Sequence, residues 1–187
     1  ALGYRDTDLP NFENYGAENI GLLRSWFVPD VHFPIEEQQK KYDIVFIGHY
    51  EDDGRLEKLE ELKRKGYNLK IFGHPEQWHC PLSQSKYLRD LMPIQTVWGD
   101  EYNKALNSAK LALCFLSKKN QDAYTRRCFE IPATKTVLVA EYSDYLDQNF
   151  TDGVNIILFK SVDDLLKKTE AVLRDDTLRS SIGLNGF

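Results

Sequence analysis

Short apolar runs alternate with amphipathic segments over most of the chain, starting near Tyr42. Residues 43–48 (DIVFIG) form an apolar run that ends in a glycine, which is typical of a strand buried on both faces of a sheet. Over residues 54–65, leucines spaced three apart among charged residues predict an amphipathic helix. Gly66 ends this helix, and residues 69–73 (LKIFG) predict the second strand.

The same alternation continues toward the end of the chain. It predicts strands at residues 95–98, 111–116, 136–140 and 155–159, and helices at 100–109, 125–133 and from Ser161 onward. This alternation predicts an α/β fold, with a Rossmann-like parallel sheet of about six strands and flanking helices. Ligands of such sheets bind beyond the carboxyl ends of the strands, so residues that follow a strand are the first candidates for a site.

Residues 1–40 differ from the rest, because they show little periodicity and contain several prolines among scattered aromatic residues. We predict an irregular N-terminal arm or interdomain connector there, with one short helix near residues 17–26. The folded α/β domain is expected to occupy residues 41–187. The chain begins without a methionine and ends just after a helical pattern, so we expect it to be a fragment of a longer protein.

The composition excludes several classes of protein. With 24 Lys and Arg against 29 Asp and Glu, the net charge is −5, whereas nucleic-acid binding usually needs a basic face, so no nucleic-acid partner is expected. No apolar run approaches the roughly 20 residues of a transmembrane segment, and no signal peptide begins the chain. Cys80, Cys114 and Cys128 are irregularly spaced, which argues against disulfides and predicts a cytoplasmic location.

The densest group of polar candidates lies between residues 120 and 141 (NQDAYTRRCFEIPATKTVLVAE), where a polar loop leads into an apolar helix and then a β-branched strand. The candidate binding residues are Asp122, Thr125, Arg126, Arg127 and Glu130. The first turn of a helix has unpaired N–H groups and the positive end of the helix dipole, so anions bind there. A carboxylate further along accepts hydrogen bonds from sugar hydroxyls. The pattern therefore predicts a site for a phosphorylated sugar or a nucleotide.

Arg127 and Glu130 also have a purely structural interpretation. They are three residues apart, so on a helix they share a face and can form a surface salt bridge. Against this, two cations in a first turn are disfavoured by the helix dipole unless an anion is nearby. Such a local conflict is expected at functional sites, and we favour the functional interpretation.

The loop after the first strand provides two further candidates, Gly48 and His49, because a glycine lets the backbone approach a ligand closely. Gly73 follows the second strand in the same way. The alternative is that both glycines only form strand-to-helix turns. Neither the Gly-x-Gly-x-x-Gly dinucleotide fingerprint nor a Walker A sequence occurs in the chain.

A metal site is not expected. His74, His79 and Cys80 match no common zinc spacing, and the Asp-Thr-Asp sequence at residues 6–8 lies in the arm instead of after a strand.

The aromatic side chains of Trp78, Trp98 and Tyr102 either stack on a nucleotide base or pack in the core, and the core is the commoner place for aromatics near strand ends.

From about residue 30 to 187, the chain resembles the C-terminal domain of glycosyltransferases of the two-Rossmann-domain (B-type, or GT-B) fold. Within these it is similar to the CgeB-like and group 1 glycosyltransferases. The resemblance rests on the segments PDVHFP, DIVFIG, LKIFG, VWGDEYNKALNSAKLALCF, TRRCFEIPATKTVLVAE and a tail of the form F-x-x-G…F-x-S-x-x-D-L.

This resemblance implies that the chain is the donor-binding domain of a glycosyltransferase, an enzyme that transfers a sugar from a nucleotide-diphosphate sugar to an acceptor, here unknown. It implies a metal-independent reaction, with no cofactor besides the donor substrate. By position, Glu130 resembles the glutamate that binds the ribose, and Asp122 stands where many relatives have a sugar-contacting glutamate. Arg127 resembles the basic group that neutralises the diphosphate.

Two positions depart from the family pattern. Many relatives have glycine where Lys135 stands, and Asp122 is one methylene shorter than the usual glutamate. B-type enzymes hold the acceptor and any catalytic base on an N-terminal Rossmann domain. Residues 1–40 are too few to form one, so we expect that domain as a partner elsewhere in the full-length protein.

Two other functions are compatible with parts of this pattern. One is a non-catalytic nucleotide- or sugar-binding module with the same fold. The other is a flavodoxin- or receiver-like signalling domain, which needs acidic residues after the first and third strands, where this chain has Gly48-His49 and Trp98-Gly99.

Overall fold

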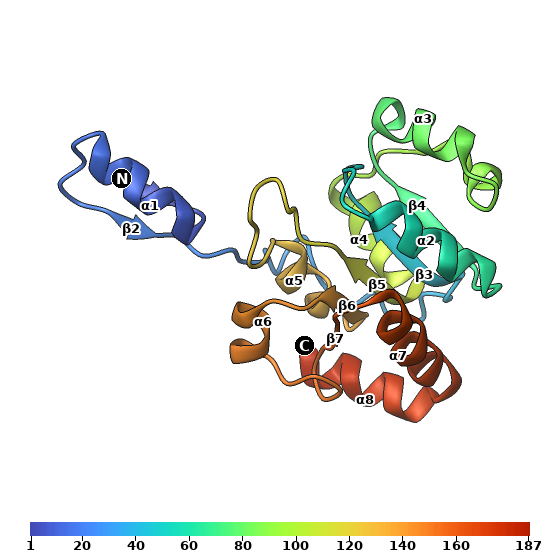
Figure 1. The fold of residues 1–187 in the computed structure, drawn as a ribbon. Helices are drawn as coiled ribbons and strands as arrows, with labels where there is room; N and C mark the ends of the chain where they lie inside the picture. Colours follow the sequence, from blue (N-terminus) through green and yellow to red (C-terminus); the bar gives the residue numbers. More distant parts are fainter.

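The computed structural model describes the backbone of residues 1–187 and every side chain except that of Asp6. Its centre is a parallel sheet of five strands within this described chain, in the order β4-β3-β5-β6-β7 (Figure 1). The strands are β3 (Tyr42–Ile47), β4 (Leu69–Phe72), β5 (Ala109–Cys114), β6 (Val137–Glu141) and β7 (Ile157–Phe159). The prediction of a Rossmann-like α/β fold with a parallel sheet is confirmed.

The strand predicted at residues 95–98 is reduced to a single parallel bridge between Gln95 and Phe72. The chain leaves the sheet immediately afterwards, because Trp98 is already the N-cap of the next helix, α4 (Gly99–Asn107). Gln95 nevertheless extends the sheet beyond β4, and Gly73 N donates to its carbonyl oxygen at 3.0 Å. With this bridge included, the strand order changes direction between β3 and β5, where Rossmann-like folds bind their ligands.

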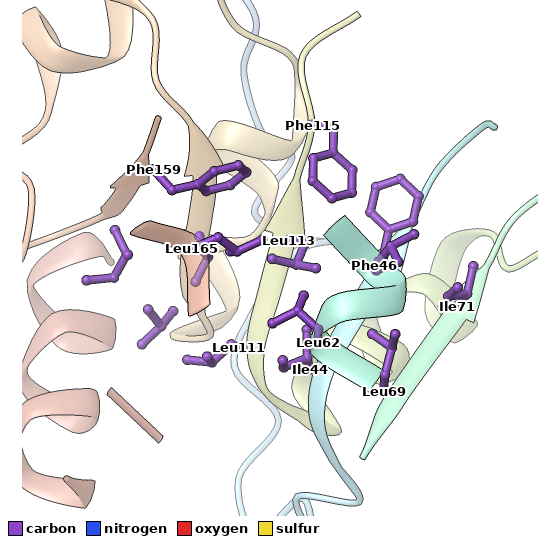
Figure 2. Packing of buried hydrophobic residues seen from close by; sticks show 14 of the residues in the cluster. Ile44, Phe46, Leu62, Leu69, Ile71, Leu111, Leu113, Phe115, Phe159 and Leu165 are labelled. Carbon is purple, nitrogen blue, oxygen red and sulfur yellow. The ribbon is translucent and has the colours of Figure 1, made fainter. Parts of the chain in front are cut away.

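The strands are buried on both faces, as their continuous apolar runs predict. Ile44 and Phe46 of β3 point to one face, and Val45 and Ile47 point to the other. Figure 2 shows the first face, where leucines of β5 and of a covering helix meet β3. This face is covered by α2 (Arg55–Arg64), α3 (Pro75–Gln84), α7 (Val162–Arg174) and α8 (Asp176–Gly186). The second face is covered by α4, α5 (Arg127–Glu130) and α6 (Asp144–Asn149).

The helix predicted over residues 125–133 is divided in two. It consists of the four-residue α5 and the 3-10 turn η3 (Pro132–Thr134), because Pro132 has no N–H to continue an α-helix. Lys135 ends the turn in the left-handed conformation, with φ 59°. Glycine adopts this conformation without strain, which is a physical reason for glycine to occupy this position in a relative.

The helices α3 and α6 were not predicted, and the helix predicted from Ser161 onward is divided at Asp175 into α7 and α8. α3 begins with Pro75, which suits a first helical position, but it also contains Pro81. In α6, the hydroxyl of Ser143 accepts a hydrogen bond from Leu146 N at 3.1 Å, which caps a helix of only six residues. None of the described helices combines the length and the apolar character needed to cross a bilayer.

The N-terminal arm contains more structure than expected (Figure 1). It has a parallel pair of two-residue strands, with a 3-10 turn and a short helix between them: β1 (Leu2–Gly3), β2 (Gly21–Leu22), η1 (Asp6–Asp8) and α1 (Leu9–Asn14). The helix predicted near residues 17–26 is wrong, because that segment contains β2. The preceding helix stops before Gly16, whose φ of 79° no helix accommodates. The Asp-Thr-Asp sequence lies in η1, and the side chain of Asp6 is outside the described part.

Two polar contacts attach the arm to the loop between β5 and α5. Arg5 Nε donates to Asp122 Oδ1 at 2.6 Å. Tyr124 Oη donates to the carbonyl oxygen of Tyr4 at 2.9 Å. The arm is therefore joined to the segment that carries the predicted binding residues.

A second attachment involves two buried asparagines of α4, which hold the segment just before β3. Asn103 Oδ1 accepts from Phe33 N at 3.2 Å, and Asn107 Oδ1 accepts from Ile35 N at 2.8 Å. Both amide groups also donate to the carbonyl oxygen of Phe33, each at 3.1 Å. These bonds fix the end of the arm against the helix that follows the Gln95 bridge.

Candidate functional site

A cleft of about 420 Å³ lies beyond the carboxyl ends of β3 and β4, beside α5. Three segments that are far apart in the sequence form it: the end of the arm, the strand-end loops of β3 and β4, and α5 with the start of α4. Its position is the one that parallel α/β sheets use for ligands. We take this cleft as the candidate site.

Five of the seven predicted residues line this cleft: Gly48, His49, Arg126, Arg127 and Glu130. Thr125 does not line the cleft; it is buried, and its hydroxyl lies 3.4 Å from Cys114 Sγ. Asp122 lines a different hollow, and its carboxylate accepts the hydrogen bond from Arg5. The structure therefore does not bring Asp122 and Thr125 together with the other five, and their predicted binding roles stay predictions.

The glycines that end β3 and β4 pack against each other. Gly48 N donates to Phe72 O at 2.9 Å, and a β-carbon on Gly48 would lie 2.8 Å from the Phe46 ring. A β-carbon on Gly73 would clash with the Gly48 carbonyl oxygen. A larger residue at Gly73 would force the two loops apart, and one at Gly48 would displace the Phe46 ring. The glycines therefore allow the backbone to border the cleft.

Arg55, the first residue of α2, fixes the loop that carries His49. Arg55 Nη1 donates to the carbonyl oxygen of His49 at 2.6 Å, and its other nitrogens bind the carboxylate of Asp53 at 2.8 and 2.6 Å. His49 itself is exposed at the cleft, with Nδ1 2.9 Å from Gln77 Oε1. The buried guanidinium therefore fixes the loop while the imidazole stays accessible.

Glu130 is the one acidic residue among the described residues that line the cleft, and 7 % of its surface is exposed. Tyr102 Oη donates to its Oε2 at 2.8 Å, and Arg126 Nη2 lies 3.0 Å from its Oε1. His32 Nε2 is 3.7 Å from the same Oε1. Burial raises the pKa of Tyr102 well above its usual value, which keeps its hydroxyl protonated as a donor to Glu130.

The structural interpretation that Arg127 pairs with Glu130 is wrong, because Arg126 forms that ion pair with i,i+4 spacing. Arg127 lines the cleft, and no described residue accepts a hydrogen bond from its buried Nε. A buried donor without an acceptor is costly and uncommon in folded proteins. Such a donor beside an open cleft is what an anion-binding guanidinium presents before its ligand arrives.

The N-terminus of α5 has less capacity to bind an anion than the sequence predicts. Cys128 N donates to Thr125 O at 3.0 Å, and Phe129 N donates to Arg126 O at 2.9 Å. First-turn N–H groups that were predicted to be free for an anion are thus already used. In a helix of four residues the dipole is also small, so the positive charge of the site comes from the two guanidinium groups.

The three aromatic candidates have different environments. Trp78 is completely buried between α3 and the sheet, as the core interpretation predicts. Tyr102 is partly buried and holds Glu130. Trp98 lines the cleft and is 78 % exposed. Of the three, Trp98 has the accessible ring that stacking on a base would require.

Several residues of the cleft were not identified as candidates from the sequence. His32, with Val28 and Val31, comes from the end of the arm, which the sequence analysis treated as a connector. Its Nδ1 accepts a hydrogen bond from Val28 N at 3.0 Å. A signal was present in the PDVHFP segment, where a histidine between prolines stands out in an irregular region. Among the described residues, no cluster of metal-binding side chains occurs.

The comparisons with solved structures show the fold. The C-terminal domain of a glycosyl transferase group 1 family protein, LpcC from Francisella tularensis, is 20% identical with a TM-score of 0.65, over 86% of this chain and 94% of that chain. Sucrose-phosphate synthase from Thermosynechococcus elongatus has a TM-score of 0.72 at 14% identity. HepE from Anabaena, in complex with UDP-glucose, has a TM-score of 0.70 at 11% identity.

The last two proteins are longer than this chain. The chain is covered to 99% and 98% in these two alignments but spans only 51% and 56% of sucrose-phosphate synthase and HepE. It thus corresponds to one Rossmann-like half of a B-type glycosyltransferase fold. No curated protein matches the sequence.

The sequence profile of a family described as "Glycosyl transferase-like" matches residues 55–187, well over half of the chain. This match includes α2, α4, α5 and the strands from β4 to β7, and with them Arg126, Arg127 and Glu130 of the cleft. The match and the shared fold agree on one class of protein. The chain is a single domain that belongs to the glycosyl transferase-like family.

Proposed function

We propose that this chain is the donor-binding domain of a glycosyltransferase, and that its cleft holds a nucleotide-diphosphate sugar. The observation that carries the proposal is the buried Nε of Arg127, which lacks an acceptor among the described residues and lines the cleft. A planar guanidinium binds phosphate oxygens with fixed, charge-assisted hydrogen bonds. Because the leaving diphosphate gains negative charge during sugar transfer, the same group would also stabilise the transition state.

The remaining groups of the cleft fit the other parts of such a donor. Glu130 provides a carboxylate that can accept hydrogen bonds from ribose hydroxyls, and Gly48 lets the ligand approach the backbone. Trp98 and the apolar wall of Val28 and Val31 provide a surface for a base. HepE, with the same fold, was solved in complex with UDP-glucose, which supports a nucleotide sugar as the ligand class.

We propose that transfer needs no metal ion and no cofactor besides the donor. Arg126 and Arg127 supply the positive charge that a divalent cation provides at other diphosphate sites. The acceptor would be held by an N-terminal Rossmann domain, since the chain spans only about half of the two longer glycosyltransferase-fold structures. A cytoplasmic location is proposed because the three cysteines are odd in number and irregularly spaced, unlike a disulfide framework.

Thermal unfolding of the isolated domain with UDP, GDP or ADP tests this function. A ligand at one hundred times its dissociation constant stabilises a protein by about 2.7 kcal/mol, so at least one diphosphate should raise the melting temperature clearly. Unchanged melting temperatures with all three would contradict the proposal. If a diphosphate binds but the full-length protein turns over no nucleotide sugar, the domain is a non-catalytic binding module.

A further inference from the structure

The two carboxylate oxygens of Glu130 have partners of very different kinds. Oε2 accepts a hydrogen bond from Tyr102 Oη at 2.8 Å, from a partly buried residue of α4. Oε1 lies 3.0 Å from Arg126 Nη2, and the side chain of Arg126 is 54% exposed. The Glu130 side chain is only 9% exposed, but Arg126 can turn into solvent without leaving its own charge buried, so the pair is easily broken on the arginine side. The enclosed Tyr102 hydroxyl has no such alternative, and losing its acceptor would be destabilising. The ion pair with Arg126 is therefore the contact of Glu130 that a ligand can replace.

The position of Tyr102 is fixed by its surroundings. Its ring meets the His32 imidazole edge-to-face, with centroids 5.9 Å apart and an interplanar angle of 85°. His32 is buried, and its Nδ1 accepts the hydrogen bond from Val28 N, so in the neutral ring the proton lies on Nε2. Glu130 is the acceptor that the described residues give the Tyr102 hydroxyl. The phenol therefore holds one oxygen of Glu130.

Oε1 retains capacity for another hydrogen bond. His32 Nε2 is 3.7 Å away, which is beyond hydrogen-bonding distance, and Arg126 uses one of the lone pairs. Because Glu130 lines the cleft, a hydroxyl group of a bound ligand can reach this oxygen. If Arg126 turns away, its guanidinium becomes free for the phosphate groups of the same ligand, beside Arg127.

We propose that Tyr102 is a positioning residue that reserves Oε2 of Glu130, so that Oε1 accepts a hydrogen bond from a ribose hydroxyl when Arg126 leaves it. This inference rests on the proposed function. The arrangement of Tyr102 and Glu130 makes the site selective for ribonucleotides over deoxyribonucleotides. A ribose hydroxyl replaces the exchangeable ion pair with a charge-assisted hydrogen bond. A deoxyribose that lacks this hydroxyl cannot form this bond, so Glu130 adds nothing to its binding affinity.

Isothermal titration calorimetry with UDP, 2′-deoxy-UDP and 3′-deoxy-UDP tests the proposal, with the GDP series measured in parallel. Wild-type protein should bind the ribonucleotide at least about tenfold more tightly than one of the deoxy analogues, the size expected for one hydrogen bond to a charged group. Tyr102→Phe should reduce this ratio to about threefold or less, because Glu130 can then turn away from the ribose. Arg126→Gln should keep the ratio while weakening binding of all the diphosphates.

Tyr142→Phe is the matched control. The Tyr142 hydroxyl also donates to carboxylates, those of Asp144 and Asp147 at 3.2 and 3.3 Å, but it lies outside the cleft. This variant should keep both the affinity and the ratio of the wild type. A merely structural role of Tyr102 would weaken ribo- and deoxyribonucleotides equally, and an unchanged ratio would therefore overturn the proposal.

Other outcomes separate this inference from the function on which it rests. If no diphosphate binds the wild type, both are overturned. If UDP or GDP binds and Glu130→Gln weakens it, but Tyr102→Phe keeps the wild-type ratio, only the role of Tyr102 is overturned. Should Tyr102→Phe not fold, a crystal of the wild type with the bound diphosphate decides. Arg126 should then have left Oε1, and an intact Arg126–Glu130 pair with the ribose elsewhere refutes the proposal.

Discussion

Trp78 Nε1 donates a buried hydrogen bond of 2.9 Å to the carbonyl oxygen of Gly48. This bond joins α3, on one face of the sheet, to the loop that borders the cleft. Gly73 lies against both partners, and a β-carbon there would be 2.5 Å from Trp78 Nε1. The geometry of the β3 loop therefore depends on a residue that does not itself contact the cleft.

Gly73→Ala should lower the free energy of unfolding by about 1–3 kcal/mol, the usual cost of forcing extra volume into a packed site. It should also weaken binding of a nucleoside diphosphate, because the loop of Gly48 must move. Urea unfolding and calorimetry measure the two effects. Gly21→Ala is the control, since its β-carbon would meet only a side-chain methyl of Leu2 at 3.2 Å. Equal stability of the two variants would contradict the packing argument.

Arg127→Ala should weaken diphosphate binding by about 1.5–3 kcal/mol, the range for hydrogen bonds to charged groups. In the absence of ligand, the same variant should be no less stable than the wild type, because it removes a buried donor that has no described acceptor. Calorimetry measures the affinity for the diphosphate, and urea unfolding measures the stability without ligand. Arg174→Ala, on α7, removes an arginine that is 79% exposed and should change neither. A loss of stability without a loss of binding would mean that Arg127 is structural.

Asp53 makes the stability of the β3 loop depend on pH. Burial raises the pKa of its carboxyl, but the hydrogen bonds and charge of Arg55 outweigh this and lower it below the usual 3.8. An acid whose pKa is lower in the folded state stabilises the fold above its unfolded pKa. This contribution is lost as the pH falls through the folded value.

Asp53→Asn should therefore be destabilised by about 1–3 kcal/mol at pH 7, as expected for loss of a buried charged partner. The difference from the wild type should shrink as the pH falls below about 4. Urea unfolding at a series of pH values measures it. Asp30→Asn, at an exposed position of the arm, should show no such change. A difference that grows on acidification would contradict the argument.

Asp122 has two competing roles, as an anchor of the arm and as the predicted contact to the donor sugar. As an anchor, it binds Arg5 with a side chain that is 8% exposed. Asp122→Asn should then speed tryptic cleavage within the arm, detectable by mass spectrometry, without changing the affinity for UDP or UDP-glucose. Selective weakening of UDP-glucose, with UDP unaffected, would instead support the sugar contact. Asp144→Asn, in the same hollow, is the control.

The sequence was sufficient to predict the sheet, because apolar runs such as residues 43–48 and 111–116 have few alternatives to a strand buried on both faces. The cluster of Arg126, Arg127 and Glu130 was also recognisable, since these residues are close in sequence and follow a strand. The sequence did not reveal which arginine pairs with Glu130, because residues three and four apart both share a helix face. The geometry of the short α5 selects Arg126.

Long-range contacts account for most of what the sequence did not reveal. His32 and Tyr102 reach Glu130 from other segments, and periodicity contains no information about such contacts. α3 was missed because Pro75 and Pro81 weigh against a helix by propensity, whereas burial of Trp78 and Leu82 stabilises it in the fold.

The wall formed by Val28, Val31 and His32 has a practical consequence for defining the smallest functional unit. An expression boundary placed at residue 41, where the regular α/β pattern starts, would remove that wall and leave Tyr102 without its aromatic neighbour. Such a truncation could still fold around its sheet and yet report a falsely weak affinity. Ligand screens on this protein should therefore retain the segment upstream of β3.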